Sequence, residues 1–400
     1  MALLTIEEPR SPAQGKPSLT HHPFFRLGFR PFYLLAAAFA AISVPLWLAG
    51  YFGLTPSRLH VNINWHVHEM VFGFAVAVII GFIFTAGRNW TGLWTPRRGH
   101  LAALAGLWLA GRLAMLVCPP ALAAVVDVSF LPLAAWPIYR VLKRAGNKRN
   151  YFLVALLGLL TCTNIVFHLS ANGILAVSPI APVEAAILIV VMIESVMGGR
   201  VIPGFTSNGV PGTKPITNPK RDSISIALTA LASVAWIAHL PAPLVAALTF
   251  AASVTQLTRL VGWKPQVTLR KPLVWILHVS YAWIAVGFFL LSLAALQYAT
   301  TSAAFHALAV GSMGGLIIGM ITRTALGHTG RPLAAGRSET LMYLLIQAGV
   351  VARLLAAANA FGVRDVLLVI AAASWSAAFL LYVAVYAPYL TRARIDGRDG

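Results

Sequence analysis

The sequence has little charge and almost no cysteine. Only 10% of its 400 residues are charged and only 11 are acidic, whereas about a quarter of the residues in a typical soluble domain are charged. The two cysteines, Cys118 and Cys162, lie far apart in apolar runs, and there is no C-x-x-C or C-x-x-C-H motif. These absences exclude thiol redox motifs, cysteine-based zinc sites and covalent c-type haem.

A signal-peptide core is also missing from the first thirty residues, so we expect the first hydrophobic run to be a retained helix. What the sequence does contain is apolar: 58% of the residues are hydrophobic. Runs of about 17–25 apolar residues are long enough to cross a bilayer as helices. We therefore predict an all-α polytopic membrane protein with about twelve transmembrane helices. The predicted spans are 33–55, 66–87, 100–118, 121–141, 151–173, 180–200, 224–240, 241–260, 272–297, 302–326, 338–360 and 366–391.

Positive charge is distributed unevenly between the loops. With these spans, 26 of the 30 Lys and Arg residues lie on the same side as the N-terminus. The positive-inside rule then makes both termini cytoplasmic. The expected parts are a cytoplasmic N-terminal segment (1–32), a helical transmembrane domain (33–391) and a short cytoplasmic tail (392–400). The formal charge of +19 follows from this topology, so no nucleic acid partner is needed to explain it.

Four histidines from three predicted helices share one predicted depth near the outer surface: His66, His68, His168 and His306. Ligand-type residues inside a membrane indicate functional sites, and imidazole suits haem iron and copper. The alternative is that these residues cap helices or contact lipid head groups. His278 lies toward the cytoplasmic half and is less easily grouped with them.

The segment "NINWHVHEMVFGF" (62–74) holds two of these histidines and an acid. At about 100° per residue, His66 and His68 point about 160° apart, so they serve two partners or two sites. Glu69 lies one turn below His66 and could orient its imidazole, as carboxylates do around metal-bound histidines. Phe72 stands where a zincin motif has its second histidine, which excludes that metalloprotease motif.

The predicted helix 302–326 carries small residues at every fourth position, namely Ala307, Gly311, Gly315 and Gly319. Such a stripe permits close approach of a neighbouring helix, or of a flat macrocycle, and the sequence does not separate the two uses.

A neighbouring face of the same helix repeats His306, Met313 and Met320 at every seventh position. This set suits haem iron or copper, or plain core packing. Arg323 and His328 follow at the cytoplasmic end, and Arg323 is a candidate for binding a haem carboxylate.

Glu194 is the most deeply embedded acid of the predicted span 180–200. A buried carboxyl group must be protonated, paired or hydrated. Proton relay, metal ligation and a salt bridge to Arg112 or Arg353 are all compatible with its position, and we expect the salt bridge.

Four long motifs in one order resemble the NnrS family of haem- and copper-containing bacterial inner-membrane proteins. They are "HPFFRLGFRPFYLL" (22–35), "WHVHEMVFGFAVAVIIGFIFTAGRNWTG" (65–92), "GGRVIPGFTSNG" (198–209) and "HALAVGSMGGLIIGMITRTALGHTGRPL" (306–333). The resemblance implies a role in the response to nitric oxide and nitrosative stress beside denitrification, with bound haem, here of the b type, and copper. His66, His68, His306 and His328 are its motif histidines.

We therefore expect a multi-pass protein of the bacterial inner membrane that is surrounded by lipid and binds or detoxifies nitric oxide, or protects cellular iron from it. His66 or His68 would hold haem together with His306, and the remaining outer histidine would hold copper together with His168. The alternative function is a secondary transporter of about twelve helices with buried acids. A haem–copper reductase is disfavoured because the only adjacent histidine pair, His21–His22, precedes the first helix.

Overall fold

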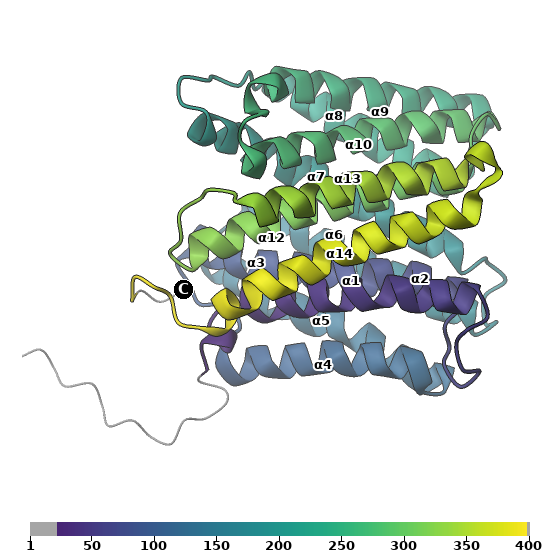
Figure 1. The fold of residues 1–400 in the computed structure, drawn as a ribbon, viewed down its shortest axis with the longest axis horizontal. Coiled ribbons are helices and arrows are strands. Elements are labelled where there is room, and N and C mark those ends of the chain that lie inside the picture. The colour runs from purple at the N-terminus through teal and green to yellow at the C-terminus, as the bar shows by residue number, and fades with distance from the viewer. Residues whose placement is uncertain (1–21, 398–400) are drawn as a thin grey trace, which may run out of the picture.

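The computed structural model describes residues 22–397, and this part of the chain is helical and contains no strand. Twelve long helices, two of which contain a π-helical segment, run side by side as a bundle (Figure 1). Eleven of them are long and apolar enough to cross a membrane. The prediction of an all-α polytopic membrane protein is therefore confirmed.

The helices follow each other with short connections, as expected where each backbone polar group must be satisfied within its own segment. In chain order they are α1 (Phe29–Tyr51), the continuous α2 (Ile63–His68), η3 (Glu69–Ala75) and α3 (Val76–Thr91), α4 (Arg98–Val117), α5 (Pro120–Arg144), α6 (Tyr151–Ala171), α7 (Ile180–Gly209), α8 (Pro219–Ile237), α9 (Ala242–Gly262), α10 (Pro272–Ala295), the continuous α11 (Thr301–His306), η6 (Ala307–Gly314) and α12 (Gly315–His328), α13 (Arg337–Ala357) and α14 (Arg364–Thr391).

Two elements differ from the prediction. α8 is not among the eleven apolar spans, because charged residues such as Lys220 and Asp222 occupy its first turn. α7 continues to Gly209, although we expected its span to end at residue 200. Pro203 does not stop this helix, since neighbouring helices and side chains can satisfy the backbone groups that a proline frees inside a membrane protein.

Both ends of the described chain lie at the same end of the bundle (Figure 1). Arg30 at the start of α1 donates hydrogen bonds to the carbonyl oxygens of Leu390 (2.9 Å) and Arg392 (2.7 Å) at the end of α14. An even number of crossings produces this arrangement. The assignment of that end to the cytoplasm stays a prediction from the distribution of charge.

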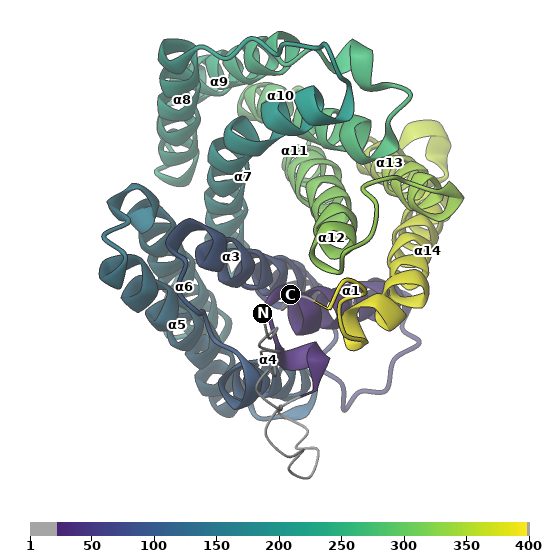
Figure 2. The same ribbon diagram turned by 90° about the vertical axis from the view of Figure 1, so that its left-hand side faces the viewer.

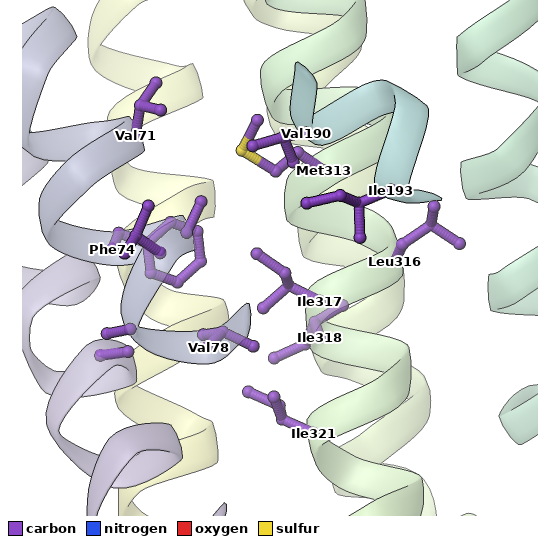
Figure 3. Close-up of a cluster of buried hydrophobic side chains, with 14 of the residues drawn as sticks. Val71, Phe74, Val78, Val190, Ile193, Met313, Leu316, Ile317, Ile318 and Ile321 are labelled. Atoms are coloured by element: carbon purple, nitrogen blue, oxygen red, sulfur yellow. The ribbon is translucent and has the colours of Figure 1, made fainter. Parts of the chain in front are cut away.

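The two histidine-rich spans are the most buried of the bundle. The apolar windows of Ile63–Thr91 and Thr301–His328 are 78% and 72% buried, against 33% for Pro120–Arg144. Seen end-on, α3 and α12 lie within a ring formed by the other helices (Figure 2). Side chains such as Val78 and Ile321 point toward each other between these two spans (Figure 3), and the apolar core is continuous there.

Candidate functional site

Both central histidine segments have an unusual backbone. Asn62 caps α2 by accepting a hydrogen bond from the Trp65 backbone N–H at 2.9 Å, and the chain widens into the π-helical η3 directly after His68. The second segment repeats this pattern: Thr300 caps α11, and the π-helical η6 begins directly after His306. Because π-helical turns are rare and occur often at functional sites, both segments mark a candidate site.

His66 and His68 leave α2 in different directions, as their spacing predicts. The His66 ring stacks on Trp47 of α1, with ring centroids 4.1 Å apart and an interplanar angle of 22°. The His68 ring instead lies against Phe167 of α6, with centroids 4.5 Å apart. The two imidazoles therefore belong to two separate environments.

His66 and His306 line one large cavity of about 750 Å³. Cofactor and ligand sites typically measure about 300–1,000 Å³ and are mostly apolar. The walls come from α1, α2, η3, α7, α11, η6, α13 and α14, and include the apolar side chains of Phe74, Met313 (Figure 3) and Trp375. The cavity thus combines two imidazoles with a wall that suits a flat, apolar group.

Each of these two imidazoles has a ring nitrogen that could bind a metal or cofactor in the cavity. The carbonyl oxygen of Ser302 lies 2.6 Å from His306 Nδ1. Because a carbonyl only accepts, Nδ1 carries the proton and Nε2 keeps its lone pair. His66 Nδ1 is buried and has no hydrogen-bond partner within residues 22–397. A buried polar atom without a partner typically costs about 1–3 kcal/mol, and a bound metal would remove that cost.

His68 and His168 meet in a second site together with Asp127 of α5. One ligand atom from each of the three residues lies within 4.8 Å of the others, and all three side chains are buried. Asp127 Oδ2 is 3.1 Å from His68 Nε2 and 3.0 Å from His168 Nε2. Asn164 Oδ1 lies 2.9 Å from His68 Nε2. Four donor atoms therefore converge in what we call the carboxylate–histidine cluster, comprising these four residues.

Two further residues, Arg112 and Glu69, change the charge around this cluster. Arg112 of α4 donates to both carboxylate oxygens of Glu69 at 2.8 Å and to Asp127. Glu69 Oε1 lies 2.9 Å from His68 Nδ1. Glu69 therefore orients His68, whereas we expected it to orient His66. Two carboxylates face one guanidinium here, so one negative charge is not neutralised by Arg112. A metal ion or a second proton on His68 would neutralise it.

Glu194 does not form the expected salt bridge. Within the described residues, its carboxylate accepts a hydrogen bond from Ser312 of η6, while Arg112 is held by the carboxylate–histidine cluster. Arg353 donates to Ser302 Oγ at 3.2 Å. The expectation failed because hydropathy gives the depth of Glu194 but not the face of α7 on which it lies. Glu194 lines a smaller, mostly apolar cavity, so proton transfer and structural support stay as its two proposed roles.

Arg323 and His328 lie far from His306, and neither lines the large cavity. His328 lies twenty-two positions after His306 in the same continuous helix, which corresponds to about 33 Å at 1.5 Å per residue. The Arg323 guanidinium lies over the Phe205 ring, 3.9 Å from its centroid, and His328 packs on Phe29. One cofactor held by His306 does not reach either residue, so we do not propose them as its ligands.

The small-residue stripe packs against another helix. A Cβ placed on Gly311 would lie 2.4 Å from Trp283 of α10, and one on Gly315 would lie 2.2 Å from Ser280 of the same helix. These distances are far shorter than a van der Waals contact, so only glycine permits the approach of α10. The stripe therefore does not carry a macrocycle.

Three residues of these sites were missed by the sequence interpretation: Trp47, Asp127 and Asn164. Asp127 carried the clearest signal, since a carboxylate in the middle of an apolar run is a functional candidate by itself. Asn164 carried a weaker signal, because it lies four residues before His168 on the same face of the helix. Trp47 carried none, because tryptophan is common near a membrane interface.

A comparison with protein families confirms the resemblance that the sequence motifs indicated. A family model with the description "NnrS protein" matches residues 23–394, which is nearly the whole chain. No curated protein matches the chain.

Proposed function

Since the chain belongs to the NnrS family, we propose that this membrane protein of the nitric oxide response holds haem b in the large cavity and copper in the carboxylate–histidine cluster. There it would bind or detoxify nitric oxide, or protect cellular iron from it. We place it in the bacterial inner membrane. The observation that carries the proposal is the division of four histidines into two pairs. His66 and His306 line one large cavity, whereas His68 and His168 are buried beside Asp127.

The large cavity fits a haem by the chemistry of its donors. His66 offers a buried nitrogen without a partner, and His306 offers Nε2, because Ser302 fixes its proton on Nδ1. Trp47 holds the His66 ring from one face. A haem iron with one histidine ligand binds nitric oxide at its open position, whereas two histidine ligands suit electron transfer.

The carboxylate–histidine cluster fits copper because two imidazoles and an oxygen donor converge there. His68 and His168 would be the nitrogen ligands, with Asp127 supplying oxygen. Glu69 would keep the proton of His68 on Nδ1 and so direct Nε2 to the metal. Arg112 would neutralise one of the two carboxylates, and the copper ion would neutralise the other.

An optical spectrum and a metal analysis of the intact protein, purified in detergent from haem-replete cells, test the proposed function. We expect a haem Soret band and about one copper per chain, because the chain has one carboxylate–histidine cluster to bind it. The spectrum with and without nitric oxide then distinguishes one histidine ligand from two. Colourless, metal-free protein would contradict the proposal and favour the secondary transporter.

Replacement of His168 by alanine separates the two sites. We expect His168→Ala to lower the affinity for copper by more than about tenfold. Residues that hydrogen-bond to a metal ligand change metal affinity 10–100-fold, and a direct ligand should contribute at least as much. The haem spectrum should stay unchanged, because His168 does not line the large cavity. Copper and haem contents of the same preparation measure both effects. Full copper content in the variant would show that this cluster is an ion network without metal.

A further inference from the structure

Two arginines line the large cavity near the end of the bundle that is remote from the chain termini. Arg353 lies in the last turns of α13, and Arg364 is the first residue of α14. They line the same cavity as His66 and His306. Arg353 is half-buried and lies within a membrane-spanning helix, whereas Arg364 is exposed.

Neither guanidinium forms an ion pair with a carboxylate within residues 22–397. Glu184 is the acidic residue among those that line the cavity, and its carboxylate accepts from the indole N–H of Trp236 at 3.0 Å. Asp365, next in sequence to Arg364, accepts from the Tyr51 hydroxyl at 3.3 Å. An arginine in a membrane helix without a counter-charge is costly, so an anionic group in the cavity would stabilise this arrangement.

Arg353 is connected to His306 through a single residue. Its Nη2 donates to Ser302 Oγ at 3.2 Å, and the backbone carbonyl of Ser302 accepts from His306 Nδ1. A ligand bound to His306 therefore has a cation beside it on the side of α13. Toward the centre of the bundle the cavity wall is apolar, with Phe74 and Met313 among its side chains. The cavity thus has one cationic end and one apolar end.

We propose that Arg353 and Arg364 bind the carboxylates of the tetrapyrrole cofactor, so that its acidic edge faces this end of the bundle and its apolar edge faces Met313. This inference rests on the proposed haem site. Arginine suits the role because its planar guanidinium forms two parallel hydrogen bonds with a carboxylate. The arginines set the orientation of the macrocycle, while the histidines hold its metal.

The test compares the release of cofactor from detergent-purified full-length protein to excess apomyoglobin, a haem acceptor. We expect Arg364→Gln, which alters an exposed residue and keeps the fold, and Arg353→Gln each to speed haem release about tenfold, as loss of a charge-assisted hydrogen bond predicts. Arg353→Lys should restore part of the retention. Arg58→Gln, an exposed residue of the α1–α2 loop that does not line the cavity, is the matched control and should release haem at the wild-type rate.

A second readout separates carboxylate binding from a structural effect. The protein stripped of cofactor is reconstituted with haem or with haem dimethyl ester, whose carboxylates are blocked. Wild type should bind haem at least about tenfold more tightly than the ester, and the double variant Arg353→Gln/Arg364→Gln should lose this preference. A double variant that keeps both the preference and the slow release would overturn the carboxylate assignment alone. Wild-type protein that binds neither form would overturn the haem site itself, and the assignment with it.

Discussion

Protein with His306→Ala is expected to lose its haem. His306 is the imidazole of the large cavity whose tautomer is fixed, because its Nδ1–H donates to the Ser302 carbonyl and directs Nε2 away from that bond. If His306 is a ligand of the haem iron, its removal should reduce haem affinity by more than about tenfold, since even residues that hydrogen-bond to a metal ligand contribute 10–100-fold. The ratio of Soret absorbance to protein measures the loss.

The matched control for this experiment is His328→Ala. Both histidines lie in the same continuous span, but His328 packs on Phe29 at the opposite end, outside the large cavity. We expect this variant to keep the wild-type spectrum and haem content. Equal haem loss in both variants would show that the effect comes from disturbance of the helix and not from a lost ligand.

Replacement of Arg112 by alanine is expected to be the most destabilising single change. Arg112 is 3% exposed and contacts two buried carboxylates, those of Glu69 and Asp127. Removing it deprives both buried carboxylates of their guanidinium partner, and breaking a buried ion pair costs about 3–5 kcal/mol. Thermal unfolding in detergent should show a large fall in melting temperature.

Two comparisons make this prediction specific. Arg394→Ala removes an arginine from the pair with Asp396 near the surface, and such pairs contribute about 0–1 kcal/mol. Its melting temperature should stay close to that of wild type. The neutral triple variant Arg112→Met/Glu69→Gln/Asp127→Asn should recover part of the lost stability, because no unpaired charge is left. An Arg112→Ala protein as stable as Arg394→Ala would contradict the described network.

The fold could be predicted from the sequence because lipid permits so few alternatives. Runs of apolar residues predict helices wherever backbone groups must be satisfied internally. Within residues 22–397, eleven of the twelve long helices meet this criterion. The bounds were less accurate where hydropathy and backbone preference disagree. α7 passes through Pro203 because neighbouring helices support it, and α8 starts among charged residues that an apolar window excludes.

The candidate sites could be predicted only in part. The angle between His66 and His68 follows from helical periodicity alone, and the structure places their rings in separate environments. The partners of these rings depend on which helices are neighbours, which a single sequence does not contain. For this reason Glu194 was assigned an arginine partner and is bonded to Ser312 instead, and the contribution of Asp127 was missed.

The central claim is that His66 and His68, two residues apart on one helix, serve two different prosthetic groups. Haem and copper contents of His66→Ala and His68→Ala, each measured per chain on purified full-length protein, test it most directly. We predict that His66→Ala loses haem and keeps copper, whereas His68→Ala loses copper and keeps haem. Loss of the same group in both variants, or of neither group in either variant, would contradict the claim.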